Sequence, residues 1–291
     1  MAKMVVMSLL VFSHANSFGA STYLVMFEEL RRLGHTVEAL DQFGHNPKYP
    51  VTNNWPHVVE ELREFVQGVK VKHQQTPILI GHSLGGAASL MLASQSPELA
   101  RGLIMIESFV FYGWKRWAIK LAKLFGKTMK RPPASVALRR RFTWDSAAQV
   151  MDHLKHKRAF KHWDERVMQD YAEGGTVETE DGKRTLKFKR EIEAKFYAYF
   201  PDNVMPMLRK NPLQCPFHFV GGLQSRELNA VGLGGTEKLV AARSGNTLQH
   251  VEGPHLFPME KPTETAQLIH ELVLLCEQTP LSARADIPPI A

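Results

Sequence analysis

Residues 77–88 read Pro-Ile-Leu-Ile-Gly-His-Ser-Leu-Gly-Gly-Ala-Ala and join a short apolar run to a run of small residues. The apolar half is typical of a strand that is buried on both faces of a parallel sheet. The part from Gly81 to Gly85 has the Gly-x-Ser-x-Gly pattern, in which a serine stands on a sharp turn between a strand and a helix. Glycines are needed there because the strand and the helix approach closely. The stretch therefore predicts Ser83 as a nucleophile.

The segments on either side of this turn alternate between strand and helix patterns. Dense apolar runs indicate strands, and apolar residues at helical spacing indicate helices between them. This order implies a parallel sheet that is covered by helices on both faces. Before residue 107 the strands are expected at 4–12, 35–40, 77–80 and 103–106, and the helices at 20–33, 55–71 and 86–94.

The alternation stops near Ser108, and the next ninety residues are aromatic, basic and helix-prone. Strand patterns return at 216–220 and 247–251, and a last amphipathic helix is expected at 263–278. Within the interruption, Asp181-Gly182 is a turn signal that favours a hairpin over 176–188. We predict a doubly wound, mostly parallel α/β sheet with a mainly helical cap insertion. The expected division is a core of 1–109 and 201–278, a cap of 110–200 and a tail of 279–291.

Composition places the chain among ordinary globular proteins. It has 291 residues, a formal charge of +7 and only two cysteines, which make no disulfide framework. The start, residues 1–12, imitates a secretory signal, but we expect its apolar run to be the first strand of the sheet. No apolar stretch reaches the roughly 18–20 residues of a membrane span. We therefore expect a cytoplasmic protein without stable membrane insertion.

Three further motifs accompany the serine turn: His14-Ala15-Asn16 after the first predicted strand, Asp41-Gln-Phe-Gly44-His45 after the second, and Gly253-Pro-His255 after the last. With them the chain resembles the α/β-hydrolase superfamily over nearly all of residues 1–278, in the serine-nucleophile branch that carries a helical cap. The resemblance implies the α/β-hydrolase fold and a catalytic triad. The chain departs from the family pattern at Ala15, where a glycine is usual.

The base and the oxyanion-binding groups follow from the turn and from the resemblance. A serine hydroxyl needs a base to take its proton. The family places that base in the loop before the last helix, where this chain has His255; the competing His250 falls within a predicted strand. The backbone N–H of Leu84 is aimed at a forming oxyanion by the turn itself. The resemblance implies that Asn16 supplies the second N–H, with Ser17 as its neighbour if the register shifts by one.

The acid of the triad is less directly indicated. The resemblance places it a few residues after the strand at 216–220, where this chain has Ser225. A serine cannot stabilise an imidazolium as a carboxylate does. Glu107 follows the strand at 103–106, and the carboxyl end of a central parallel strand faces the active-site crevice. We predict Glu107 as the acid, as in some dehalogenases and lipases that the chain resembles, and keep Glu227 as the alternative.

We expect a serine hydrolase that cleaves a carboxylic ester or related acyl bond through Ser83, His255 and Glu107, by way of an acyl-enzyme. Neither a metal nor an organic cofactor is expected. Aromatic residues of the cap favour a small-molecule substrate with an apolar acyl or aromatic part. The same resemblance leaves open a carbon–carbon bond hydrolase, a lactonase or an acyltransferase, and also a ligand-binding protein with a vestigial hydrolase site.

A basic stretch runs from Lys115 to Arg141, with Trp114 directly before it and Trp117 near its start. The simplest interpretation is a solvated helix face. Such a stretch can also touch an anionic membrane surface or steer an anionic substrate. No nucleic-acid-binding motif accompanies the charge, so we expect no nucleic-acid partner. A homodimer is left open.

Overall fold

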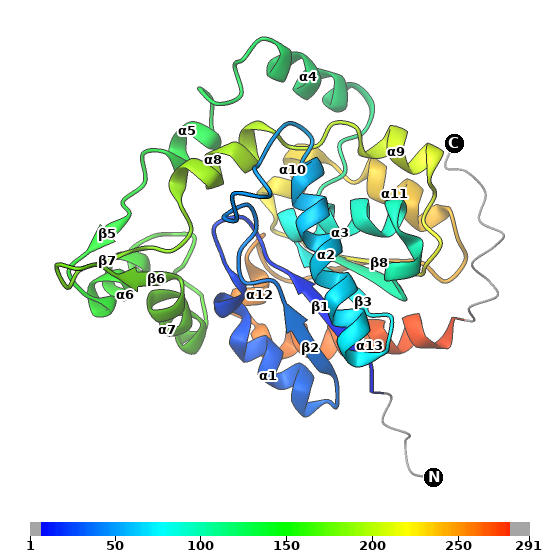
Figure 1. Cartoon of the computed structure of the whole chain (residues 1–291), viewed down its shortest axis with the longest axis horizontal. Helices are drawn as coiled ribbons and strands as arrows, with labels where there is room; N and C mark the ends of the chain where they lie inside the picture. The colour runs from blue at the N-terminus through cyan, green and yellow to red at the C-terminus, as the bar shows by residue number, and fades with distance from the viewer. Residues whose placement is uncertain (1–6, 280–291) are drawn as a thin grey trace.

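The computed structural model describes residues 7–279, and its centre is a six-stranded sheet (Figure 1). The strand order is β2-β1-β3-β4-β8-β9, and every neighbouring pair is parallel. The predicted fold class is therefore confirmed. The strands are β1 (Leu9–Ser13), β2 (Thr36–Ala39), β3 (Ile78–His82), β4 (Gly102–Ile106), β8 (Phe217–Gly222) and β9 (Thr247–Val251).

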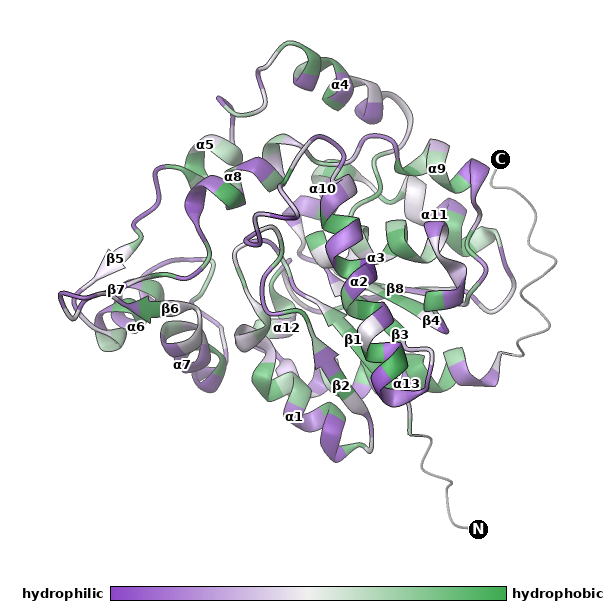
Figure 2. Ribbon diagram, viewed as in Figure 1, coloured by the Kyte–Doolittle hydropathy of each residue, from purple (hydrophilic) through white to green (hydrophobic). Residues whose placement is uncertain are grey.

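Alternate residues of the strands enter two separate cores, as a sheet buried on both faces requires. In β3, Leu79 packs with α2 and α3, while Ile78 and Ile80 pack with α1 and α13. Figure 2 shows the apolar strands in green between these helices. The helices around the sheet are α1 (Leu24–Arg32), α2 (Pro56–His73), α3 (Leu84–Gln95), α10 (Arg226–Val231), α11 (Gly234–Ala241), α12 (Phe257–Glu260) and α13 (Pro262–Gln278).

The element boundaries differ from the predicted ones by a few residues. A 3-10 turn, η1 (Ala20–Tyr23), precedes α1, so the predicted helix at 20–33 is two elements. A second short 3-10 turn, η2 (Pro97–Leu99), follows α3. Residues 1–6, which include the beginning of the predicted first strand, lie outside the described residues. The predicted tail also lies outside them, apart from Thr279.

The chain between β4 and β8 forms a layer above the carboxyl ends of the strands (Figure 1). The last helix before β8, α9 (Val204–Lys210), packs against α3 in the core. The layer contains the helices α4 (Gly113–Leu124), α5 (Ala134–Ala137), α6 (Ala147–Lys155), α7 (Glu165–Gly174) and α8 (Arg190–Ala198). It also contains a three-stranded antiparallel sheet of β5 (Thr143–Trp144), β7 (Arg184–Leu186) and β6 (Thr176–Glu178).

The small antiparallel sheet was predicted only in part. The hairpin of β6 and β7 forms around Gly182, whose φ of 76° is the left-handed conformation that favours glycine. The third strand, β5, was missed because it is two residues long and has no detectable alternation. None of the helices in residues 7–279 combines the length and the apolar character needed to cross a bilayer.

Candidate active site

Ser83 stands between β3 and α3 in a strained backbone conformation, with φ 53° and ψ −113°. Two hydrogen bonds fix this turn, one to the neighbouring strand β4 and one from the loop directly after it. The Ser83 N–H donates to the carbonyl of Ile106 at 2.9 Å, and the Ser108 hydroxyl donates to the Ser83 carbonyl at 2.6 Å. A strained residue persists only where its surroundings determine it, and such residues cluster at functional sites.

The glycines of the turn are required by close backbone contact. A Cβ atom at Gly85 would lie 2.0 Å from the carbonyl oxygen of Ser13, and one at Gly81 would lie 2.4 Å from the backbone of Gly85. These distances are shorter than any van der Waals contact. The sequence pattern therefore reflects the packing of β1, β3 and α3 against one another.

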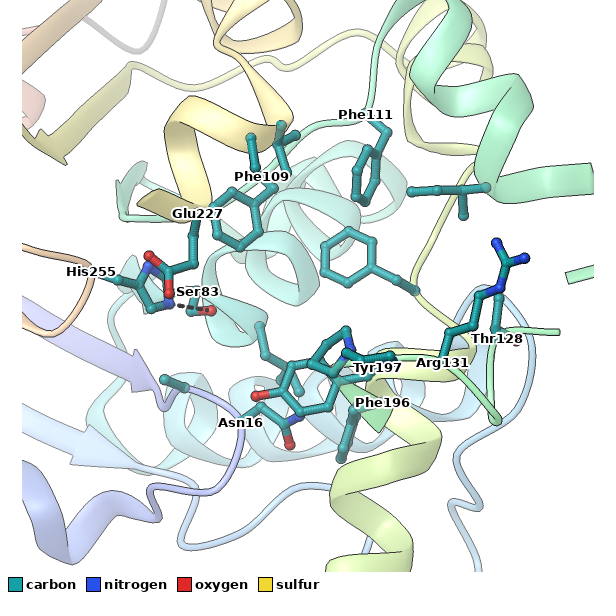
Figure 3. Close-up of a pocket in the computed structure, with 18 of the residues that line it drawn as sticks. Asn16, Ser83, Phe109, Phe111, Thr128, Arg131, Phe196, Tyr197, Glu227 and His255 are labelled. Carbon is teal, nitrogen blue, oxygen red and sulfur yellow. Dashed lines mark hydrogen bonds between the residues drawn. The ribbon is translucent and has the colours of Figure 1, made fainter. Parts of the chain in front are cut away.

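His255 follows β9, and its imidazole points at the Ser83 hydroxyl (Figure 3). Its Nε2 lies 3.1 Å from the Ser83 hydroxyl oxygen, and its Nδ1 lies 2.8 Å from Oε2 of Glu107. The ring of Phe109 stacks on the imidazole at a centroid distance of 5.4 Å. The imidazole is thus held between a hydroxyl and a carboxylate, in the geometry of a serine–histidine–acid triad.

Glu107 is fully buried directly after β4, and its φ of 50° places it in the left-handed region. Besides His255, two groups donate to its carboxylate. The backbone N–H of Gly222 donates to Oε1, and the Ser225 hydroxyl donates to Oε2 at 2.7 Å. A buried carboxylate needs such donors, because an unpaired charge in a dry site is costly.

Ser225, at the position where the family resemblance places the acid, therefore contacts the carboxylate that reaches His255. Its hydroxyl also accepts from the Leu228 N–H at 3.1 Å and caps α10. Glu227 lies on α10, is exposed and lines the cavity next to Ser83. Among the described residues, no hydrogen bond or ion pair joins Glu227 to His255. The structure brings Glu107 and not Glu227 to the histidine.

Asn16 and Leu84 both line the cavity beside Ser83. Within residues 7–279, neither backbone N–H has a hydrogen-bond partner, so both donors are available. Ser17, the neighbour in an alternative register, does not line this cavity. The Asn16 side chain donates to the carbonyl of Glu193 on α8 at 3.1 Å and ties this loop to the cap.

A buried hydrogen-bond chain connects the Asn16 loop to the histidine loop. The Ala15 N–H donates to the Tyr23 hydroxyl at 3.1 Å, and that hydroxyl contacts Nδ1 of His82 at 2.8 Å. The other ring nitrogen of His82 contacts the carbonyl of His255 at 3.0 Å, where it can only donate. Burial lowers the pKa of His82 well below its usual value, so the ring is neutral and Nδ1 accepts from Tyr23.

His14 holds the same loop from the other side. Its Nδ1 donates to the Ala15 carbonyl at 2.8 Å, and its Nε2 accepts from the Phe43 N–H at 3.0 Å. Burial lowers the pKa of His14 to about 4, so this ring is also neutral near pH 7. The neutral rings of His14 and His82 thus hold the backbone of the Asn16 loop and of the His255 loop, on either side of Ser83.

Sequence reasoning missed the roles of Tyr23 and Ser225. Tyr23 lies 59 residues from His82 in the chain, and nothing in the local pattern of its short helix marks it. The role of Ser225 could have been inferred from the expected sheet order, because β4 and β8 are adjacent in a doubly wound sheet. A carboxylate at the end of one strand can therefore meet a hydroxyl at the end of the next.

The cavity at Ser83 has a volume of about 560 Å³ and is mainly apolar. In Figure 3, Ser83 and His255 lie at one end, and Thr128 and Arg131 of the cap lie at the other. The walls come from both the sheet loops and the cap. They include Phe18, Trp55, Phe109, Phe111, Ile119, Ala122, Phe196, Tyr197, Phe200, Val231 and Leu256. Across residues 7–279, no group of three or more His, Cys, Asp or Glu side chains could hold a metal ion.

Comparison with known proteins identifies the family and the fold. The sequence profile described as the Alpha/beta hydrolase family matches residues 10–268. A monoglyceride lipase of Rattus norvegicus is 29% identical over 107 residues, which are 35% of this chain and 35% of that protein. The chain thus matches about a third of the length of this curated relative.

Solved structures resemble the chain over most of its length. A peroxisomal alpha-beta-hydrolase of Saccharomyces cerevisiae superimposes with a TM-score of 0.72 and 15% identity, covering 98% of this chain and 81% of that one. An E-2-(acetamidomethylene)succinate hydrolase superimposes with a TM-score of 0.66 and 19% identity, covering 92% of each chain. At sequence identities this low, the structural likeness establishes the fold alone.

Proposed function

Because the chain belongs to the alpha/beta hydrolase family, we propose that it is a hydrolase of carboxylic esters that works through an acyl-enzyme on Ser83. The observation that carries this proposal is the continuous contact from the Ser83 hydroxyl through both nitrogens of His255 to Glu107. A serine so placed can be deprotonated as it attacks a carbonyl.

In the acylation step, the Ser83 oxygen bonds to the carbonyl carbon and its proton moves to Nε2 of His255. The imidazolium then gives that proton to the alkoxy oxygen, and the alcohol leaves as the carbon–oxygen bond breaks. Glu107 holds the ring through Nδ1–H and stabilises the positive charge that the ring gains. Ser225 and Gly222 keep the carboxylate in place.

The carbonyl oxygen becomes an oxyanion in the tetrahedral intermediate. The N–H groups of Leu84 and Asn16 are the two donors we assign to it, since neither has a hydrogen-bond partner among residues 7–279 and both residues line the cavity. The amino terminus of α3 adds a favourable dipole. Water then attacks the carbonyl carbon of the acyl-enzyme while His255 takes a proton from it. The bond to the Ser83 oxygen breaks, the imidazolium returns the proton to that oxygen, and the acid product leaves.

The substrate part of the proposal rests on the cavity. Its walls are mostly aromatic and aliphatic, and its size suits a small molecule with an apolar acyl or aromatic part. The curated relative that is a monoglyceride lipase is consistent with ester chemistry.

Labelling with a fluorophosphonate tests the proposal, because such a probe reacts with a serine that is activated by a base. We expect wild-type protein to be labelled at Ser83, and both Ser83→Ala and His255→Ala to abolish labelling. His250→Ala is the matched control: its side chain is exposed on β9, and labelling should be unchanged.

A wild-type protein that is folded, as judged by its thermal melt, but does not react would contradict the proposal. A ligand-binding protein with a vestigial site would then be favoured. Labelled protein that turns over no ester would instead favour another acyl acceptor or another bond.

A further inference from the structure

The helix α4 exposes a large apolar surface on the outside of the cap. No residue of α4 is buried, and five large apolar side chains on α4 and at its end are 51–78% exposed. They recur at helical spacing, so that they share one side of the helix. We call them the α4 patch: Trp114, Trp117, Leu121, Leu124 and Phe125.

The charged residues of the segment that carries the α4 patch are all basic. Residues 113–131 contain seven lysines and arginines and neither aspartate nor glutamate. Three of these cations attach the helix to the body. Lys115 donates to the carbonyls of Ala230 and Val231, Arg116 donates to the Asp202 carbonyl, and Lys123 pairs with the Asp202 carboxylate.

Of the remaining cations, Lys120 and Lys127 lie beside rings of the patch, whereas Arg131 lines the catalytic cavity. Lys120 sits 5.0 Å from the centre of the Trp117 ring, and Lys127 sits 5.6 Å from that of Phe125. Within residues 7–279, no carboxylate pairs with Lys120, Lys127 or Lys130, and all three are exposed. The outer surface of α4 therefore combines tryptophans, aliphatic side chains and unneutralised ammonium groups.

The opposite side of α4 faces the catalytic cavity. Ile119 and Ala122 line that cavity, and so do Thr128 and Arg131 just after the helix. The helix is also bounded by Gly113 and Gly126, which have left-handed φ values of 61° and 64°. Figure 1 shows α4 standing at the edge of the molecule, above the other elements. Whatever the outer side binds will thus lie next to the far end of the cavity.

We propose that the α4 patch docks on an anionic lipid surface, with its apolar side chains at the boundary between headgroups and acyl chains and its lysines on the lipid phosphates. Tryptophan, leucine and lysine in this arrangement are typical of helices that lie in the membrane interface. A second copy of this chain fits the patch poorly, because two such basic surfaces repel each other. This inference goes beyond ester hydrolysis and does not depend on Ser83.

The positions of the tryptophans provide a direct test. The chain has five: Trp114 and Trp117 are exposed on α4, and the other three, Trp55, Trp144 and Trp163, are at most 6% exposed. A change in tryptophan emission on adding vesicles therefore reports on α4. Vesicles of equal parts phosphatidylcholine and phosphatidylglycerol should shift the emission to the blue and protect it from an aqueous quencher. Vesicles of phosphatidylcholine alone should do so much less.

Two sets of variants separate the apolar and the charged parts while keeping both tryptophans. The combined variant Leu121→Ser, Leu124→Ser and Phe125→Ser should weaken vesicle binding at least tenfold. Its control replaces three exposed apolar residues elsewhere, Val71→Ser, Val177→Ser and Leu223→Ser, and should bind as wild type does.

The charge variant combines Lys120→Gln, Lys127→Gln and Lys130→Gln. It should weaken binding about 10²-fold, since each lysine near an anionic surface contributes about fivefold. Its control removes the same charge at Lys155, Lys161 and Lys210, which are exposed on other elements. Circular dichroism melts verify that every variant is folded.

The proposal is overturned if anionic vesicles produce no emission shift. It is equally overturned if the α4 variants bind as tightly as their controls. If the apolar variant changes the mass of the protein in solution and leaves vesicle binding unchanged, the patch is a contact between copies of the chain and not a lipid-binding surface.

Discussion

The loops that hold the triad and the helix that covers the cavity are built in opposite ways. Around Ser83, the backbone packs so closely that Gly85 has no room for a Cβ atom, and Glu107 is fully buried with a donor on each carboxylate oxygen. In α4, no residue is buried, and a Cβ atom at Gly126 would meet nothing within 4 Å. We call the first region the catalytic floor; it comprises the triad, the Asn16 loop and the buried residues that hold them. We call the second region, residues 113–126, the α4 roof.

The comparison separates the residues that position the reacting groups from the residues that control access to the cavity. The floor determines the positions of the reacting groups, so that small changes there should alter both stability and rate. The roof is attached by lysine and arginine side chains to backbone carbonyls, so its substitutions should alter what reaches the cavity and leave the core intact. The predictions below test this division.

Gly85→Ala should be the most damaging change in the floor. The new methyl carbon would lie 2.0 Å from the Ser13 carbonyl oxygen, and the backbone of two elements would have to move. We expect the free energy of unfolding in urea to fall by at least about 4 kcal/mol, or the protein to fail to fold. Gly126→Ala in the roof has open space and only a left-handed φ to strain, so it should cost about 1–2 kcal/mol. Equal losses would contradict the division.

Acidic pH should destabilise the protein through protonation of His14 in the catalytic floor. Burial lowers the pKa of His14 to about 4 in the folded state, whereas the unfolded value is near 6.5. The unfolded chain therefore binds the proton first, and stability that is complete above pH 6.5 is lost as pH falls towards 4. This group contributes roughly 3 kcal/mol to the loss. Free energies of unfolding measured across this range should show a shallower pH dependence in His14→Gln, and an unchanged one in His156→Gln, an exposed residue of the cap.

Tyr23→Phe should have a smaller effect on stability and a specific effect on rate. It leaves the Ala15 N–H and Nδ1 of His82 without partners in a buried site, which costs about 1–3 kcal/mol. Because the chain of bonds ends at the His255 carbonyl, kcat should also fall, by roughly 10- to 100-fold. Tyr49→Phe, whose hydroxyl bonds to Glu64 near the surface, is the matched control. A Tyr23 variant with full kcat would show that the network only stabilises the fold.

Leu124→Ser in the roof should barely change stability. The side chain is 78% exposed, and substitutions at such positions usually change the free energy of unfolding by less than about 0.5 kcal/mol. Chemical denaturation of wild type and variant checks this expectation. A loss above about 1 kcal/mol would mean that α4 is packed against another surface and is not an open roof.

Much of the fold could be predicted from the sequence because the strands and turns of the catalytic floor each have a local sequence pattern. Buried parallel strands have continuous apolar runs, and the turn at Ser83 has the glycines that its packing requires. The cap was predicted less completely. Its two-residue strand β5 has no pattern of its own, and α4 is attached through lysine contacts with distant carbonyls that no spacing reveals.

The candidate site was predictable where one motif determines one residue. Ser83, Leu84 and His255 follow from turns and loops, and the structure brings them together with Glu107 and Asn16. The choice between Glu107 and Glu227 could not be made from spacing alone. It depends on a contact between residues 148 positions apart, and on donors from β8 that surround the carboxylate of Glu107.

The central claim is that Glu107 supplies the carboxylate of the triad, and comparing Glu107→Gln with Glu227→Gln tests it most directly. The measurement is the rate of fluorophosphonate labelling together with kcat on an aryl ester. We expect Glu107→Gln to lower both by up to about 10⁴-fold, as loss of the acid does in serine hydrolases, while Glu227→Gln leaves kcat close to that of wild type. The opposite order, a severe loss in Glu227→Gln and near-normal rates in Glu107→Gln, would contradict the account.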